Sequence, residues 1–135
     1  MSDNFDAESK DALIKYRLDR ANETLAEAQL LCDGGYYNAA VNRLYYACYY
    51  AAVSLLLKYG INAQTHAGVR TMLGLHFVNT GKLAPQMART FSILFNQRHS
   101  GDYDDFVYCD REMVDELTPK AKEFIDAVKE LIGSE

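Results

Sequence analysis

One short segment, residues 91–105, carries side chains that can act on a phosphate group. It holds a guanidinium, an imidazole, a carboxylate and a phenol close together, at Arg98, His99, Asp102 and Tyr103. An arginine binds phosphate through charge-assisted hydrogen bonds, and the other groups can hold or release a proton beside a ribose–phosphate bond. The same residues also have a structural interpretation, in which Arg98 pairs with Asp102 or Asp105 and fixes the segment against the fold.

Other kinds of site have little support in the sequence. The histidines, His66, His76 and His99, lie far apart, and neither H-E-x-x-H nor a paired-cysteine spacing occurs, so we expect no metal. A glycine-rich phosphate loop is missing too, and we expect no cofactor. The three cysteines, Cys32, Cys48 and Cys109, are an odd number without C-x-x-C spacing, which suggests a reducing cytoplasm. Cys32 and Cys48 occupy helix positions, so we expect them to be buried, inert thiols.

The charges are distributed unevenly along the chain. The formal net charge is −5, from 14 Lys and Arg against 19 Asp and Glu, which argues against broad, non-specific binding of nucleic acid. All the acids, however, lie before Gly34 or after Gly101, and the segment between them carries only basic charges. Two interpretations fit this pattern. Acidic outer helices cover buried central ones, or a basic functional groove lies within an acidic shell.

The spacing of apolar residues predicts only helices, in a single domain of residues 1–135 with a core of about 7–132. A first helix over about 6–33 is followed by Gly34 and Gly35, which suit a helix end. A second covers about 36–59 and ends before Gly60. No stretch alternates with a period of two, so we expect an all-α fold without a sheet.

The second helix has two stripes at helical spacing. One is apolar, and the other is aromatic and includes Tyr46 and Arg43. Six of the ten tyrosines fall between Tyr36 and Tyr50, and a buried phenol needs a hydrogen-bond partner. A helix that is apolar or aromatic on two faces is typical of the centre of a bundle or of a subunit contact.

Three further helical regions complete the prediction. Thr65 can cap a third helix over about 66–79. Pro85 suits the first turn of a fourth, whose apolar seam ends at Arg98, so we expect Arg98 to point into the bundle and a polar loop, residues 100–105, to follow. In the last region, Pro119 predicts a kink or a restart capped by Thr118.

With these elements in place, the sequence resembles the HEPN family (higher eukaryotes and prokaryotes nucleotide-binding), in its branch of small stand-alone prokaryotic proteins. The matching segments are YYNAAVNRLYYA at 36–47, THAGV at 65–69, residues 77–83 and residues 98–104, and the resemblance covers nearly all of 7–132. It implies an up-and-down bundle of four to five helices that forms a homodimer. Such proteins are often encoded beside a minimal nucleotidyltransferase in toxin–antitoxin or defence modules.

The resemblance also implies a site. Many members are metal-independent endoribonucleases in which an arginine steadies the scissile phosphate and a histidine a few residues later transfers protons. Arg98 matches the arginine, but Tyr103 stands at the position of the histidine, and His99 is adjacent to Arg98. A phenol, with a reference pKa of about 10, is a poor general base at neutral pH.

Three functional hypotheses follow. The leading one is a non-catalytic nucleotide- or RNA-binding partner in a two-protein module, with Arg98, Asp102, Tyr103 and His99 at a groove and with Arg43 and Tyr46 as its second wall. The alternatives are an endoribonuclease that uses Arg98 with Tyr103 or His99, and a protein-interaction module built on the tyrosine-rich helix. The N-terminus lacks the pattern of a signal peptide and no apolar run would span a bilayer, so we expect a soluble cytoplasmic protein without membrane contact.

Overall fold

The computed structural model describes residues 6–103 and 108–133, with side chains for 6–97 and 108–133. These residues form five α-helices and one π-helical turn and contain no strand, so the expected all-α bundle is confirmed. The elements are α1 (Ala7–Asp33), α2 (Tyr37–Lys58), α3 (His66–Leu73), η1 (Gly74–Val78), α4 (Pro85–Tyr103) and α5 (Arg111–Gly133).

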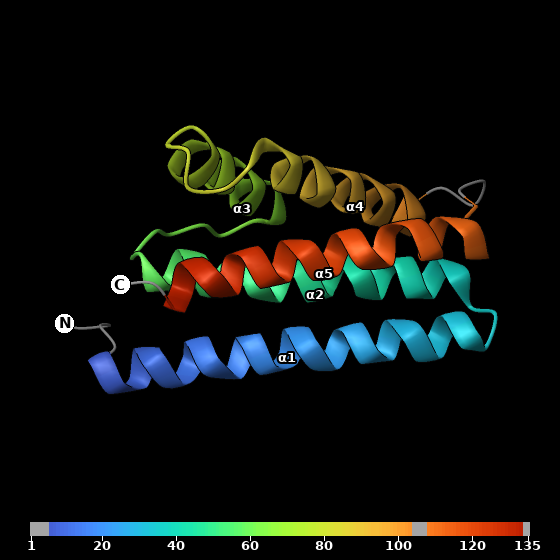
Figure 1. Cartoon of the computed structure of the whole chain (residues 1–135), viewed down its shortest axis with the longest axis horizontal. Coiled ribbons are helices and arrows are strands. Elements are labelled where there is room, and N and C mark those ends of the chain that lie inside the picture. Colours follow the sequence, from blue (N-terminus) through green and yellow to red (C-terminus); the bar gives the residue numbers. More distant parts are fainter. Residues whose placement is uncertain (1–5, 104–107, 134–135) are drawn as a thin grey trace.

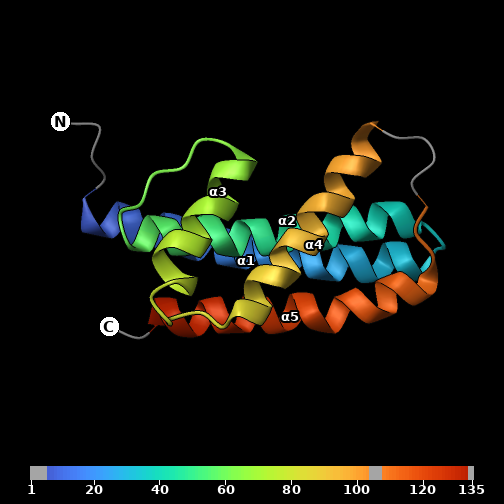
Figure 2. The same cartoon turned by 90° about the horizontal axis from the view of Figure 1, so that it is seen from above.

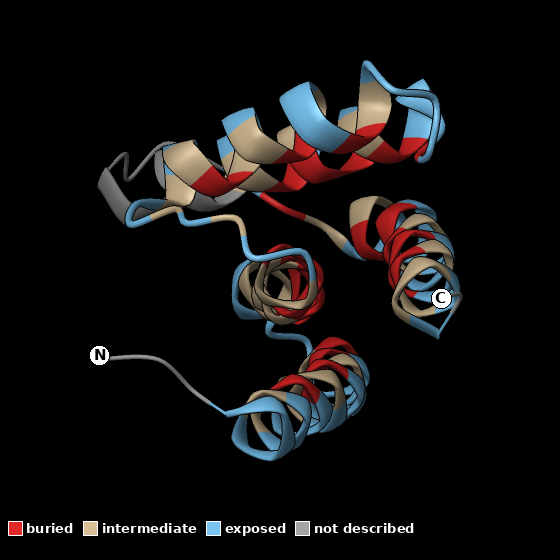
Figure 3. Ribbon diagram, turned by 90° about the vertical axis from the view of Figure 1, so that its left-hand side faces the viewer, coloured by how far each residue is buried: buried red, intermediate tan, exposed pale blue. Residues whose placement is uncertain are grey.

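The helix α2 lies at the centre of the bundle. It contacts α1, α3, α4 and α5, and Figures 1 and 2 show α1 and α5 alongside it. The helix α4 crosses obliquely over this group, with α3 beside it (Figure 2). The buried residues of the helices face one another around α2, as Figure 3 shows in red. The predicted central position of the second helix is therefore correct.

Glycine ends α2 at the predicted place. Gly60 has a φ of 71°, a conformation that side chains with a Cβ rarely adopt. Its N–H donates to the carbonyl of Leu57 at 3.1 Å, and the N–H of Ile61 donates to that of Leu56 at 2.9 Å. This pair of bonds is a Schellman motif, which satisfies the last carbonyls of the helix and turns the chain towards α3.

Two expected boundaries differ from the structure. The third predicted helix begins at His66 but changes at Gly74 to the π-helical turn η1, where the N–H of Asn79 donates to the carbonyl of Gly74 at 2.9 Å. The fourth begins at Pro85 as expected, and its backbone stays helical to Tyr103, so the loop predicted from Ser100 begins later. Polar composition predicted that loop, and a polar segment can equally continue a helix on its solvated side.

The predicted restart at Thr118 is wrong, because α5 runs unbroken through Pro119. The Oγ1 of Thr118 donates to the carbonyl of Val114 at 2.7 Å, a bond of the helix interior and not of a cap. A proline inside a helix costs about 3 kcal/mol. The apolar face of α5 offsets this cost, since Val114, Leu117, Ala121 and Phe124 are all buried against the bundle.

All three cysteines are buried and free, which confirms the predicted burial of Cys32 and Cys48 and adds Cys109. Burial raises the pKa of the Cys48 thiol, and its Sγ lies 3.8 Å from the carbonyl oxygen of Ala121 on α5. Burial and the neighbouring Asp110 also raise the pKa of Cys109. The thiolate is the reactive form of cysteine, and a raised pKa disfavours it. Cys48 and Cys109 therefore serve the packing of the bundle and not a reaction.

Candidate functional site

Four tyrosines of α2 form a continuous set of phenol rings. We call this set the tyrosine face and define it as Tyr45, Tyr46, Tyr49 and Tyr50. Neighbouring rings are in contact, with centroids 5.2 Å apart for Tyr45 and Tyr46 and 6.2 Å apart for Tyr49 and Tyr50. Tyr45 is fully buried and the other three are half-buried. The face thus runs from the core to the surface of the bundle.

His66, the first residue of α3, lies against this face. Its Nδ1 is 2.7 Å from the hydroxyl oxygen of Tyr45, and its ring stacks on Tyr49 with centroids 4.3 Å apart at 23°. The ring of Tyr46 meets it edge-on at 5.8 Å. The imidazole is therefore held by a hydrogen bond, a stack and an edge contact, which together fix its orientation.

The start of α3 is set by local hydrogen bonding. Thr65 is the N-cap that the sequence predicted, and its Oγ1 accepts the N–H of Gly68 at 2.8 Å. A Cβ at position 68 would lie 3.0 Å from that oxygen, so glycine allows the close approach. The cap holds the first turn of α3 in one position and thereby places His66 on the tyrosine face.

On its other side, Tyr45 meets α4. Its ring centroid is 5.6 Å from that of Phe91 and 6.1 Å from that of Phe95. The guanidinium of Arg70 lies 4.4 Å from the centroid of Phe95, a cation–π contact. No described carboxylate forms an ion pair with Arg70. An aromatic cluster from α2, α3 and α4 therefore has an arginine at its edge without a carboxylate partner among these residues.

The predicted residues of α4 continue the helix beyond this cluster. Positions 98 and 102 follow Phe91 and Phe95 at steps of three and four, the spacing of one helix face. The side chains of Arg98, His99, Asp102 and Tyr103 lie outside the described residues, as does Asp105. The inward direction of Arg98 and its pairing with Asp102 or Asp105 therefore stay predictions.

Arg43 and Tyr46, the predicted second wall, do lie together. The guanidinium of Arg43 is 5.5 Å from the ring centroid of Tyr46. Its Nη1 also donates to Oε1 of Glu27 on α1 at 3.0 Å. A phosphate that binds Arg43 would therefore compete with the carboxylate of Glu27. Tyr46 also contacts His66, so it joins Arg43 to the aromatic residues around that imidazole.

Tyrosine is also exposed where α2 begins. Tyr36 is 66% exposed and Tyr108, before α5, is 75% exposed. Both line a hollow of about 460 Å³, in which the Oδ1 of Asn38 accepts the N–H of Cys109 at 2.8 Å. The tyrosine-rich helix thus reaches the surface at two separate places.

Tyr46 is the one described residue of the cluster that was among the predicted site residues; the sequence did not single out His66, Tyr45 and Tyr49, nor Phe91, Phe95 and Arg70. The sequence held a partial signal, since Tyr45 and Tyr49 are one turn apart and His66 follows a capping threonine. Neither pattern predicts that the first turn of α3 packs onto that turn of α2. Only the fold brings them together.

No three histidine, cysteine, aspartate or glutamate side chains come together as a metal site within the described part of the chain. Among the same residues, no helix combines the length and the apolar character that crossing a membrane requires.

Comparison with known proteins decides the family. The model of the HEPN domain matches residues 14–131. The chain belongs to the HEPN domain family. A "UPF0332 protein" of Thermotoga maritima is 37% identical over 123 residues, which cover 91% of this chain and 93% of the relative. A protein of Methanocaldococcus jannaschii named "Putative toxin" is 33% identical over 119 residues, covering 88% of each chain.

A solved structure agrees with the HEPN assignment at the level of the fold. The crystal structure of an archaeal HEPN homologue superimposes with a TM-score of 0.72 and covers 88% of this chain and 97% of that one. The two sequences are 21% identical, so this likeness concerns the fold alone. The resemblance seen in the sequence is thereby confirmed.

Proposed function

We propose that this HEPN protein binds RNA or nucleotides without cleaving them, as one partner of a toxin–antitoxin-type module whose other partner is a nucleotidyltransferase. The observation that carries the proposal is the aromatic cluster around His66, bordered by Arg70 and continued along α4 towards Arg98. Support for the module comes from the family and from the relative named as a toxin.

The chemistry of the cluster suits a nucleic-acid strand. Proteins that bind single strands combine aromatic side chains, on which bases stack, with cations along the backbone. Tyr46 and Tyr49 are half-buried rather than in the core, and Arg70 adds a cation at the edge. In this proposal Arg98 holds a phosphate, with Asp102, Tyr103 and His99 around it.

The absence of catalysis in the proposal rests on residue types. Tyr103 stands where the family's nucleases have histidine. The described imidazole of the cluster, His66, has its Nδ1 bonded to the hydroxyl of the buried Tyr45 and its ring face stacked on Tyr49. Such contacts suit a residue that positions its neighbours.

We also propose a homodimer. A two-fold interface brings one surface patch against its own copy. If the face that carries Arg98 lies at the dyad, the two copies form one composite groove, and its doubled positive charge would attract an RNA backbone.

Binding of a fluorescently labelled single-stranded RNA at low salt tests the proposal. We expect Arg98→Ala to weaken binding by about tenfold or more, because a charged hydrogen bond to phosphate is worth about 1.5–3 kcal/mol. Arg89→Ala is the matched control, since Arg89 is an exposed arginine of the same helix. Equal affinity of Arg98→Ala and the wild type, or no binding of RNA or nucleotides by the wild type, would overturn the proposal.

The second candidate is a metal-independent endoribonuclease in which Arg98 acts with Tyr103 or His99. The feature that favours it is the set of Arg98, His99 and Tyr103 within the last two turns of α4, which puts a cation, an imidazole and a phenol close together. Incubation of RNA with the protein in a chelator separates the two candidates. Cleavage that is lost in Arg98→Ala and in Tyr103→Phe or His99→Ala would establish the enzyme, and intact RNA at every protein concentration would exclude it.

A further inference from the structure

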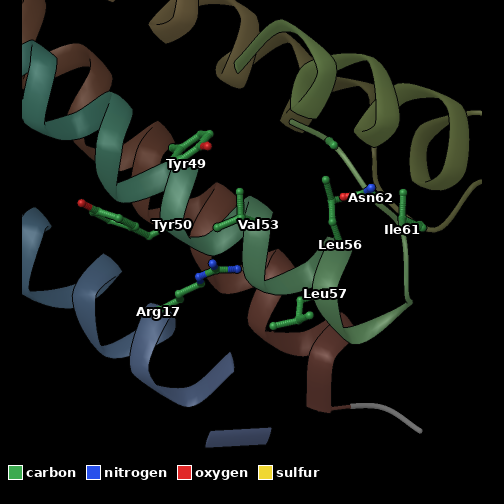
Figure 4. Close-up of a pocket in the computed structure, with 9 residues that line it drawn as sticks. Arg17, Tyr49, Tyr50, Val53, Leu56, Leu57, Ile61 and Asn62 are labelled. Atoms are coloured by element: carbon green, nitrogen blue, oxygen red, sulfur yellow. The ribbon is translucent and has the colours of Figure 1, made fainter. Parts of the chain in front are cut away.

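A pocket of about 330 Å³ lies beside Tyr49 and Tyr50 (Figure 4). It is enclosed by α1, by the second half of α2 and by the connection to α3. Its lining residues are Arg17, Tyr49, Tyr50, Val53, Leu56, Leu57, Ile61, Asn62 and Ala63. Its volume is at the lower end of the range of small-molecule sites, about 300–1,000 Å³.

The apolar side of the pocket is held in place by the end of α2. In the Schellman motif at Gly60, the N–H of Ile61 donates to the carbonyl of Leu56, and the side chains of both residues line the pocket. A hydrophobic contact between these two positions commonly accompanies the motif. Val53 and Leu57 extend the same wall along α2 (Figure 4). The wall is therefore built of residues with fixed backbone positions.

The polar side of the pocket holds the cation of Arg17, which has no carboxylate partner among the described residues. The side chain of Arg17 extends from α1 towards Tyr50 and Val53 (Figure 4). It is half-buried, and no described carboxylate forms an ion pair with it. The positions three and four residues away on α1 are Leu13, Ile14, Arg20 and Ala21, none of which is acidic.

The neighbouring arginines differ from Arg17 in this respect. Arg20 pairs with Glu23 at 2.8 Å, and hydrogen bonds to Glu23 and then to Tyr50 raise its pKa. Arg43 pairs with Glu27 at 3.0 Å. Arg17, Arg20 and Arg43 all lie where α1 meets α2. Of these three, Arg17 alone has no ion pair with a described carboxylate, so its charge is available to a bound anion.

We propose that this pocket is a second ligand site, for a small molecule that joins a planar ring to one anionic group, such as a nucleoside monophosphate. Arg17 would hold the anion, the apolar wall would cover the ring, and the side-chain amide of Asn62 would hydrogen-bond to its polar edge. The choice of a nucleotide rests on the proposed function. The need for an anion rests on Arg17 alone.

The pocket adjoins the aromatic cluster at Tyr49. Tyr49 lines the pocket and also stacks on His66 at 4.3 Å. A ligand that displaces the ring of Tyr49 would alter its stack on His66, which is the first residue of α3. In this proposal a ligand in the pocket would affect the aromatic cluster through Tyr49 and would not need Arg98.

Calorimetric titration of the full chain with AMP, adenosine and labelled RNA tests the inference, with far-UV circular dichroism to establish that each variant is folded. We expect Arg17→Gln to weaken AMP binding by about tenfold, which corresponds to the loss of one charged hydrogen bond. Arg20→Gln is the matched control and should change AMP affinity by less than about twofold, since its charge is already paired. Adenosine should bind the wild type about as weakly as AMP binds Arg17→Gln.

Further variants separate this inference from the proposed function. Arg98→Ala should retain AMP binding in the pocket while losing affinity for RNA. If Arg17→Gln also weakens RNA binding, the pocket takes one nucleotide of a strand, and if it does not, the ligand is a free nucleotide. Either result supports the second site. The inference is overturned if AMP does not bind, if Arg17→Gln binds AMP like the wild type, if adenosine binds as tightly as AMP, or if Arg98→Ala alone abolishes AMP binding.

Discussion

The two faces of α2 differ in how deeply they are buried and in what they contact. On the packing face, Ala40, Leu44, Ala47, Ala51 and Leu55 are completely buried. On the tyrosine face, Tyr46, Tyr49 and Tyr50 are half-buried, and each touches a ring or a guanidinium from another element. Both stripes have the same helical spacing, so the difference lies in residue size and polarity.

That difference has a physical meaning. Alanines and leucines carry no directional group, so their stabilisation depends on the area they bury and on close packing with α1 and α5. A tyrosine adds a hydroxyl that must find a partner, and Tyr45 finds His66. The packing face should therefore control stability, while the tyrosine face should control orientation and binding.

Replacing a leucine of the packing face should have the largest effect. Leu44→Ala would leave a cavity at a fully buried position and should lower the free energy of unfolding by about 2–5 kcal/mol, measured by urea denaturation. RNA affinity of the folded fraction should be unchanged. Tyr46→Phe, on the same helix, is the control and should change stability far less. If Tyr46→Phe lowers the free energy of unfolding more than Leu44→Ala does, the packing face is not the one that controls stability.

An intermediate effect is expected from the buried hydroxyl of the tyrosine face. Tyr45→Phe removes the partner of the Nδ1 of His66 and should cost about 0.5–1.5 kcal/mol of unfolding free energy. A double-mutant cycle with His66→Ala should show that the two changes are not additive. Tyr16→Phe, which alters a tyrosine that is 61% exposed, should have no effect. Full additivity in the cycle would show that the bond does not stabilise the fold.

The smallest effect is expected where the tyrosine face meets α1. Glu27→Gln removes the carboxylate that pairs with Arg43 and should cost at most about 1 kcal/mol, because both side chains are partly exposed. High salt should reduce the difference, since it screens the pair in the wild type. Glu8→Gln, at an exposed position of α1, is the control. If RNA affinity rises in Glu27→Gln, Arg43 is a phosphate contact that the carboxylate normally restrains.

Features set within one helical turn could be predicted from the sequence. The ends at Gly34–Gly35 and Gly60, the cap at Thr65 and the start at Pro85 all agree with the structure. Of the two expectations at Pro119, a kink or a restart, the restart is wrong because the local cost of the proline is smaller than the gain from the burial that continues on both sides of it. The π-helical turn at Gly74 had no recognisable signal, since a helix and a π-helical turn have similar residue preferences.

The candidate site was predictable only in part. Arg43 and Tyr46 were singled out and do lie together, but the pairing of Arg43 with Glu27 depends on how α1 lies against α2. The contact of His66 with Tyr45 and Tyr49 joins residues about twenty positions apart in sequence.

The sequence by itself determined the helices, their buried faces, the family and the acid-free centre that carries Arg43 and Arg98. Each of these follows from the identity and local spacing of residues, which a single helix already expresses. The tertiary structure decided which faces meet, and so it decided the partners of His66 and Arg43 and placed Arg17, which no described carboxylate pairs with, beside a pocket. The reason is that apolar periodicity specifies that a face will be buried, whereas the packing of all five helices selects what covers it.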